Sequence, residues 1–243
     1  MTKIVDIKDF SDNNLFENLS ISIEKNKFIT ISGANSCGKT TLIRILNREV
    51  ITDNNIIVNN KPINDYSISE YANLVQAVIP LELILEEKPI NIISKDLIKK
   101  LRLKDFINKR KEELTNKELI LIQIAIALSN NPKILLLDDV FTYLDKKEIE
   151  DVVKTIKTYK DLTTILSTIN LNDSLYTDYL YIINDKKIIL KGEPLKVLEK
   201  DNIINKSGLN LPFMVDLSVK LKDYELLDSI ELDKDRMVNK LWK

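Results

Sequence analysis

The sequence predicts an α/β fold whose core is a mostly parallel β-sheet with an antiparallel flank. Short apolar runs typical of buried strands alternate along the chain with segments that have apolar residues at helical spacing. A glycine-containing loop joins the apolar run 28–31 to the helix-like segment 41–46. Later, segments 178–184 and 187–191 read as two strands joined at Asp185 and Lys186, which predicts a terminal hairpin.

Composition fits one large domain, or a domain with a small appendage. The chain has 243 residues and a net charge of −1, so there is no bulk electrostatic basis for binding nucleic acid. The absence of histidine excludes His-based metal sites and acid/base catalysis. The single cysteine, Cys37, cannot form an intrachain disulfide and favours a reducing compartment.

The chain shows neither a signal peptide nor a membrane-spanning segment. Its first residues lack a long apolar core, and no apolar run approaches the ~20 residues that cross a bilayer. We therefore expect a soluble protein, or one held at a membrane through a partner.

Local patterns predict the elements in order. Lys3–Ile7 and Leu19–Ile23 alternate as strands of an edge sheet, and 54–60 contains a short strand between turn formers. Apolar residues at i, i+3 and i+4 predict helices over 81–131, with a break at Pro89. The other predicted elements are strands at 72–79, 132–140 and 163–168 and a helix at 146–159.

A boundary at Ser207-Gly208 divides the predicted chain into two parts. We expect one nucleotide-binding domain over residues 1–206, with a helical subdomain at roughly 80–131, and a helical tail over 207–243.

The glycine loop has the spacing of the Walker A motif G-x-x-x-x-G-K-[ST], between a strand and a helix as that motif requires. Backbone amides can curl around phosphate oxygens there, and the helix N-terminus adds roughly half a positive charge. Lys39 would reach the β- and γ-phosphates, and the Thr40 hydroxyl would bind Mg²⁺. The residues predicted to bind the nucleotide are Gly33, Ala34, Asn35, Ser36, Cys37, Gly38, Lys39, Thr40 and Thr41.

Two adjacent carboxylates end the predicted strand at 132–140. Asp138 follows four apolar residues, as in a Walker B strand, so it lies at the carboxyl edge of the sheet beside the phosphate loop. Asp138 would hold Mg²⁺ through water, and Asp139 would face the γ-phosphate and orient the attacking water. ATP and Mg²⁺ are the cofactors that this pair of motifs predicts.

Two further side chains have alternative interpretations. Gln76 interrupts its apolar run, either as a satisfied polar group in the core or in a loop where it contacts Mg²⁺ and the attacking water. We favour the loop, because Gln76 lies between the phosphate loop and the carboxylates. Phe10, in the loop between the first two strands, could stack on adenine, and a half-buried surface aromatic is at least as good an interpretation.

The order of these motifs resembles an ABC-type ATPase. Residues 178–194 and 207–221 are similar to segments of the A-components of energy-coupling factor (ECF) importers. The resemblance implies a P-loop NTPase fold with a RecA-like core and an inserted helical subdomain. The positions that carry it are Gly33–Thr40, Gln76, Leu114–Glu118, Asp138, Asp139, Asp145 and Asn170.

The resemblance also implies an assembly. Two ATPase subunits would face each other head to tail with two ATP molecules between them, each on one subunit's Walker A and under the other's signature segment. Thr115 would contact the partner's γ-phosphate, and Asp145 would lie near the shared nucleotide. Membrane-embedded subunits would transmit the closing motion to a vitamin- or metal-binding subunit, so the chain would be peripheral at the cytoplasmic face of the cell membrane.

Several positions depart from the family pattern. The signature reads L-T-N-K-E over Leu114–Glu118 in place of L-S-G-G-Q, and its Glu118 brings a carboxylate near phosphate. Ser36 stands where the superfamily often has glycine, and Asn170 stands where the switch histidine is usual. Asp139 replaces the usual glutamate, a shortening of about 1.5 Å, and a misplacement of ~1 Å can cost ~100-fold in rate.

We therefore expect an ATP-binding subunit of an ECF-type importer with weakened hydrolysis. The altered signature favours a heterodimer with a more competent ATPase. One alternative is a non-hydrolysing, ATP-gated scaffold. The other, a soluble ABC protein that acts on ribosomes or DNA, lacks the usual second ATPase domain and basic surface.

Overall fold

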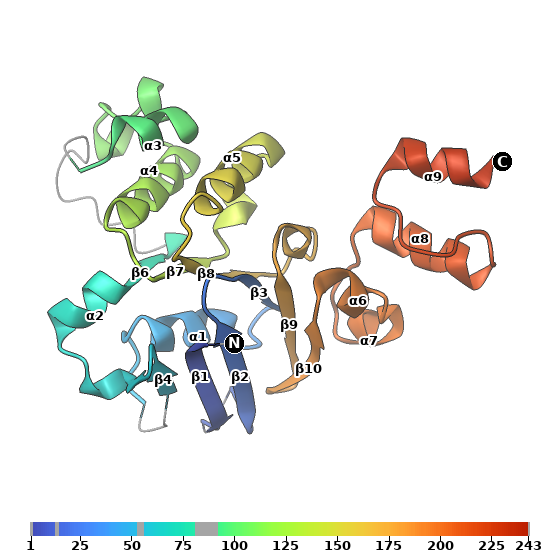
Figure 1. Ribbon diagram of the computed structural model, residues 1–243, viewed down its shortest axis with the longest axis horizontal. Helices are drawn as coiled ribbons and strands as arrows, with labels where there is room; N and C mark the ends of the chain where they lie inside the picture. Colours follow the sequence, from blue (N-terminus) through green and yellow to red (C-terminus); the bar gives the residue numbers. More distant parts are fainter. Residues whose placement is uncertain (1, 13–14, 53–55, 81–91, 243) are drawn as a thin grey trace.

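The computed structural model describes residues 2–12, 15–52, 56–80 and 92–242 (Figure 1). Its central sheet has six strands in the order β10-β9-β3-β8-β7-β6. All of them run parallel except β10, which pairs antiparallel with β9. The predicted parallel core with an antiparallel flank is confirmed. The six strands are β3 (Phe28–Gly33), β6 (Val75–Val78), β7 (Ile134–Asp138), β8 (Thr163–Thr168), β9 (Tyr179–Asn184) and β10 (Lys187–Gly192).

A second sheet is antiparallel, with the strand order β2-β1-β4-β5. It corresponds to the edge sheet expected from the alternating N-terminal segments. Its strands are β1 (Lys3–Phe10), β2 (Leu19–Glu24), β4 (Ile56–Val58) and β5 (Lys61–Pro62).

The helices cover both faces of the central sheet. Figure 1 shows α1 between the two sheets, and α3, α4 and α5 on the opposite side of the central sheet. The helices of the described ranges are α1 (Lys39–Leu46), α2 (Ile68–Leu74), α3 (Lys95–Lys100), α4 (Asn116–Ser129), α5 (Lys146–Ile156), α6 (Pro194–Leu198), α7 (Asp201–Lys206), α8 (Phe213–Asp223) and α9 (Lys234–Leu241).

Strand β7 shows why the sheet needs helices on both faces. Ile134 and Leu136 belong to the apolar core shared with α1 and the second sheet, whereas Leu135 and Leu137 belong to the core shared with α4 and α5. Successive side chains of a strand point to opposite faces, so a strand covered on both sides is apolar throughout. This double burial fixes the position of Asp138, the next residue, at the carboxyl edge.

The predicted strand at 72–79 is wrong in its first half. Ala72–Leu74 form the last turn of α2, and β6 begins only at Val75. The helix starts because the Ser67 hydroxyl accepts a hydrogen bond from the Glu70 amide (3.2 Å). Of the predicted helical region, residues 81–91, including Pro89, lie outside the described residues, and α3 and α4 occupy the remainder.

The C-terminal segment carries α8 and α9. Val215 and Val219 of α8 share an apolar cluster with Leu198 of α6, Ile204 of α7 and Ile182 of β9. The boundaries at 206 and at 80–131 stay predictions. Across the described ranges, none of the helices combines the length and the apolar character that crossing a bilayer requires.

Candidate functional site

The loop between β3 and α1 encloses the ammonium group of Lys39. Lys39 Nζ donates hydrogen bonds to the carbonyl oxygens of Gly33 (2.7 Å) and Ala34 (3.0 Å). Lys39 is also the first residue of α1, whose first turn contains no acidic side chain. The free amides of this helix end and the lysine therefore make the loop a positive centre.

Both glycines of the motif are required sterically. A Cβ on Gly33 would lie 2.5 Å from the Ile183 carbonyl oxygen of β9. Gly38 has φ 101° in the left-handed region, and a Cβ there would lie 2.6 Å from the ring of Phe16. Ser36, at φ 62°, adopts a conformation that costs a non-glycine residue roughly 1–2 kcal/mol.

The two carboxylates lie at the carboxyl end of β7, Asp138 as its last residue and Asp139 directly after it. Asp138 is 5% exposed, and its Oδ1 accepts a hydrogen bond from the Ser167 hydroxyl of β8. Asp139 turns out of the strand at φ 51° and accepts a hydrogen bond from Thr142 Oγ1 (2.9 Å). Burial, together with the charge of Asp138, raises the pKa of Asp139 against the opposing effect of the Thr142 hydrogen bond. A raised pKa makes this carboxylate a better proton acceptor.

Loop and carboxylates share one cavity of about 250 Å³. The Thr40 hydroxyl and the Asp138 carboxylate are oxygen donors of the kind that Mg²⁺ prefers, and Lys39 with the α1 N-terminus suits phosphate. The residues present therefore fit a magnesium–nucleoside triphosphate. The cavity is lined by Leu15, Asn35, Ser36, Gly38, Lys39, Thr40, Thr41, Asp138, Asp139 and Ile169.

Asn170 does not reach this cavity. Its Oδ1 accepts hydrogen bonds from the backbone amide (3.1 Å) and side-chain amide (2.8 Å) of Asn172, and its Nδ2 donates to Asp173. Ile169, one residue earlier, lines the cavity instead. The structure thus does not bring the Asn170 side chain into the cavity, because β8 ends at Thr168 and Ile169 is the residue that lines it. The role of Asn170 as the switch contact stays a prediction.

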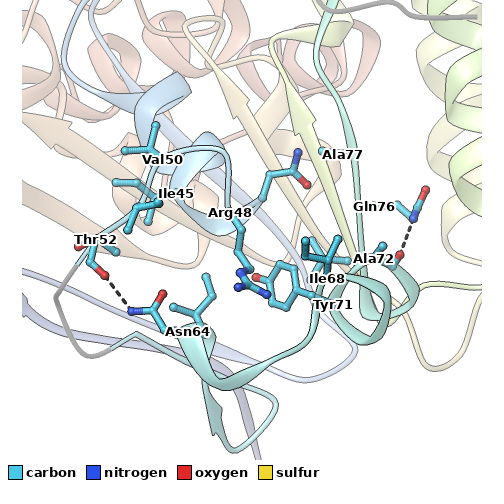
Figure 2. Close-up of a pocket in the computed structure, with 14 residues that line it drawn as sticks. Ile45, Arg48, Val50, Thr52, Asn64, Ile68, Tyr71, Ala72, Gln76 and Ala77 are labelled. Carbon is cyan, nitrogen blue, oxygen red and sulfur yellow. Dashed lines mark hydrogen bonds between the residues drawn. The ribbon is translucent and has the colours of Figure 1, made fainter.

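Gln76 is also misplaced by the sequence interpretation. It lies within β6, where it pairs with Leu135 of β7, three residues before Asp138. Its Nε2 donates to the Ala72 carbonyl (2.6 Å), and its Oε1 accepts from Asn130 (3.0 Å). Figure 2 shows it at a different pocket, beside Ala72, and that pocket is also lined by Arg48 and Tyr71. Both ends of the Gln76 amide therefore have hydrogen-bond partners, which fits the interpretation as a satisfied polar group and not the interpretation as a loop contact to Mg²⁺.

Phe10 is neither in a loop nor half-buried. It is the last residue of β1, is 2% exposed and belongs to the core shared with α1. Its ring packs edge-on against Phe16, with centroids 5.5 Å apart. Sequence reasoning missed one signal, the adjacent apolar residues Leu15 and Phe16 shortly before β2. Leu15 lines the cavity, and the ring of Phe16 packs against Gly38.

Thr115 and Glu118 form the N-terminal cap of α4. The Glu118 carboxylate accepts hydrogen bonds from the Thr115 amide (2.8 Å) and hydroxyl (2.9 Å) and pairs with Lys109 (2.9 Å). Burial acts to raise the pKa of Glu118, but the Thr115 and Lys109 hydrogen bonds outweigh it and leave the pKa below its ordinary value. The carboxylate is therefore ionised and neutralised within its own subunit.

Asp145 caps α5 in the same way, through a hydrogen bond from the Glu148 amide (3.0 Å). Lys117, in the signature, pairs with Glu148 at 2.9 Å and approaches Asp145 at 3.9 Å. The signature helix and the segment after the carboxylates are thus joined by an ion pair.

A glycine loop that joins a parallel strand to a helix, with a carboxylate at the end of a second parallel strand, defines a P-loop nucleotide-binding protein. The family model described as ABC transporter matches residues 16–142, just over half of the chain. The chain belongs to this family.

The chain is similar to relatives along its whole length. It is 27% identical to the energy-coupling factor transporter ATP-binding protein EcfA of Pediococcus pentosaceus, over 97% of this chain and 95% of the relative. It is also 27% identical to EcfA1 of Mesomycoplasma hyopneumoniae, over 100% and 98%. The solved structure of CbiO1 from Clostridium perfringens, part of the ABC transporter complex cbiONQ, matches with a TM-score of 0.69 and 22% identity, over 89% of this chain and 99% of that one.

Proposed function

We propose that this chain is the ATP-binding subunit of an ECF-type ABC importer. The observation that carries the proposal is the single cavity that joins Lys39, Thr40 and Asp138. Similarity to EcfA proteins over nearly the whole chain supports the importer class. The transported solute would be a vitamin or a metal ion, selected by membrane-embedded partners, with this chain bound peripherally at the cytoplasmic face of the membrane.

Each site residue has a role that follows from its position. When bound, MgATP supplies the free energy for transport. Lys39 and the α1 amides bind the β- and γ-phosphates, while Thr40 and Asp138 hold Mg²⁺. Asp139, whose pKa is raised, orients the attacking water and accepts its proton.

The second half of each nucleotide site would come from another subunit. Thr115 begins α4 at its exposed end, and Asp145 is also exposed. We propose that both face the nucleotide of a second ABC ATPase. Because Asn116 and Lys117 replace glycines in this signature, a heterodimer with a more competent relative suits the chain better than a homodimer.

Hydrolysis would be weak for three structural reasons. Ile169 occupies the cavity position from which a polar side chain would contact the γ-phosphate. Asp139 is one carbon shorter than glutamate and is held by Thr142. The Thr115 hydroxyl already donates its hydrogen bond to Glu118. Ile169, which has no polar side-chain atom, also favours the alternative of a non-hydrolysing, ATP-gated scaffold.

Calorimetric titration of the full chain with MgATP tests the proposal. We expect binding by the wild type and at least about tenfold weaker binding by Lys39→Ala, because a charge-assisted contact is lost. Lys95→Ala, an exposed lysine at the start of α3, is the matched control and should bind normally. Equal affinities for wild type and Lys39→Ala would reject the site.

Hydrolysis by the purified membrane complex separates the two candidate functions. An importer subunit should show solute-dependent ATP turnover, however slow. A scaffold should retain its membrane partners only with ATP present and show no turnover.

A further inference from the structure

The carboxyl ends of β7 and β8 lie side by side in the central sheet. Asp138, the last residue of β7, is in register with Ser167 of β8. Residues paired in this way across parallel strands present their side chains to the same face of the sheet. Asp138 is 5% exposed and Ser167 is 1% exposed, so the two side chains meet away from bulk water. Buried polar groups of this kind find their hydrogen-bond partners inside the protein.

Ser167 holds the two consecutive carboxylate residues through different atoms. Its hydroxyl donates a hydrogen bond to Asp138 Oδ1, and its carbonyl oxygen accepts one from the Asp139 amide (3.0 Å). A serine hydroxyl has a single proton to donate, and here Asp138 receives it. The side chain of Ser167 therefore fixes the orientation of the first carboxylate, and its backbone fixes the point at which the chain turns toward the second.

This hydrogen bond occupies one oxygen of the Asp138 carboxylate. Within the part of the chain that the structure describes, the bond from Ser167 is the one that the carboxylate accepts, and it goes to Oδ1. Oδ2 is thus available to a ligand. Asp138 lines the cavity together with Thr40, the other oxygen donor that suits Mg²⁺ there, whereas Ser167 does not line it.

We propose that Ser167 is a positioning residue for the magnesium site, which holds Asp138 so that Oδ2 faces the metal. The inference rests on the proposed nucleotide-binding function. Partners that orient a metal-binding side chain through a hydrogen bond typically account for about 10–100-fold in metal affinity. Without the hydroxyl, the buried carboxylate keeps its charge but loses both its donor and its fixed orientation. Because Ser167 is outside the cavity lining, its effect on nucleotide binding should appear only when Mg²⁺ is present.

Titration of the full chain with ATP, once with Mg²⁺ and once with EDTA, tests this role. The ratio of the two affinities measures the contribution of the metal. Ser167→Ala should weaken MgATP binding by roughly 10–100-fold and leave binding of metal-free ATP within about twofold of the wild type. The matched control is Ser32→Ala in the neighbouring strand β3, because that buried hydroxyl has no hydrogen-bond partner among the described residues. It should bind both forms as the wild type does.

A double variant shows whether Ser167 acts through Asp138. Asp138→Asn removes the charge that the metal needs and should itself weaken MgATP binding. Once Asp138 is replaced, adding Ser167→Ala should cause little further loss, since residues that act through one contact are not additive. Ser167→Cys, whose S–H group is a weak donor, repeats the test if Ser167→Ala misfolds, and it should also weaken MgATP more than metal-free ATP.

Three results would overturn this inference alone: unchanged MgATP binding by Ser167→Ala, equal weakening of both forms of ATP, or losses that add fully in the double variant. Equal weakening would mean that Ser167 supports the fold of the cavity and not the metal site. Wild-type binding that is the same with Mg²⁺ and with EDTA would overturn the inference together with the magnesium role of Asp138. Failure of the wild type to bind ATP in either form would overturn the proposed function.

Discussion

At the scale of single residues, the carboxyl group of Asp173, close to the site, has a strongly raised pKa. Asp173 is 2% exposed and accepts a hydrogen bond from Thr168 Oγ1 (2.7 Å), at the end of the strand that leads to Ile169. Burial, with the charge of Asp139 adding to it, raises the pKa of Asp173 to about 6, although the Thr168 hydrogen bond lowers it. Folding therefore favours the protonated acid over the carboxylate.

Asp173→Asn should reveal this linkage. The folded-state pKa lies above the unfolded value of about 3.9. The contribution of Asp173 to the stability of the fold is therefore fully present below about pH 4 and is lost as the pH rises through about 6. Asparagine mimics the protonated acid and carries no such loss. The free energy of unfolding of Asp173→Asn relative to wild type should increase by up to roughly 3 kcal/mol between pH 4 and pH 7.

Urea unfolding at several pH values measures that difference. Asp178→Asn is a useful comparison, since that carboxylate caps the Phe28 amide at an exposed position. A difference between Asp173→Asn and wild type that stays constant with pH would contradict a raised pKa at Asp173.

Residue-scale errors of the sequence interpretation share one physical cause. The positions of Lys39 and Asp138 could be predicted from the sequence. A Walker A glycine loop leads into a helix that begins at its lysine, and a buried apolar strand places the residue after its apolar run at the edge of the sheet. Asn170 and Gln76 were expected at the cavity and do not line it, because strand ends are uncertain by a few residues and each step turns a side chain to the other face. Phe10 was misplaced because β1 extends further than its alternation shows.

At the scale of elements, the N-terminus of α4 combines a helix cap with the proposed contact to a partner's nucleotide. Thr115→Ala removes the capping hydroxyl and should cost about 1 kcal/mol of unfolding free energy. Thr115→Ser retains the hydroxyl and should cost much less. Glu118→Gln keeps an oxygen for the Thr115 amide and loses the exposed pair with Lys109, so it should cost under about 1 kcal/mol. Denaturant unfolding of the three variants ranks these effects.

The same helix end explains a limit of sequence reasoning at this scale. Glu118 was expected to bring a carboxylate near the phosphate of a partner's nucleotide, and that expectation stays a prediction. Its pairing with Lys109 could not be foreseen, because those side chains are nine residues apart and meet only through the turn that precedes α4. By contrast, α5 was predictable, since a long periodic segment with a clear cap depends little on tertiary context, and β8 was predictable as a short run that is buried throughout.

At the scale of the whole molecule, the doubly covered sheet brings Lys39, Thr40, Asp138 and Asp139 to one cavity, and the proposed partner subunit would supply the other half of the nucleotide site. The alternation of apolar runs and helical segments was enough to predict this architecture. Which side chain faces the cavity at each strand end could not be predicted, and Ile169 is the example that bears on the proposed weak hydrolysis. A histidine there would supply a polar group next to Asp139 without altering the core, because Ile169 is 36% exposed.

Ile169→His should therefore raise ATP turnover by at least about tenfold, since acid–base groups contribute roughly 10²–10⁴-fold when well placed. The increase should appear only in the assembled complex, because the isolated chain lacks the second subunit's signature. Ile169→Asn is the matched control, with a polar group that cannot titrate near neutral pH. Steady-state phosphate release, measured with and without the partner subunits, checks both statements. If the histidine and asparagine variants match wild type in the complex, the position does not limit hydrolysis, and the cause lies in Asp139 or the signature.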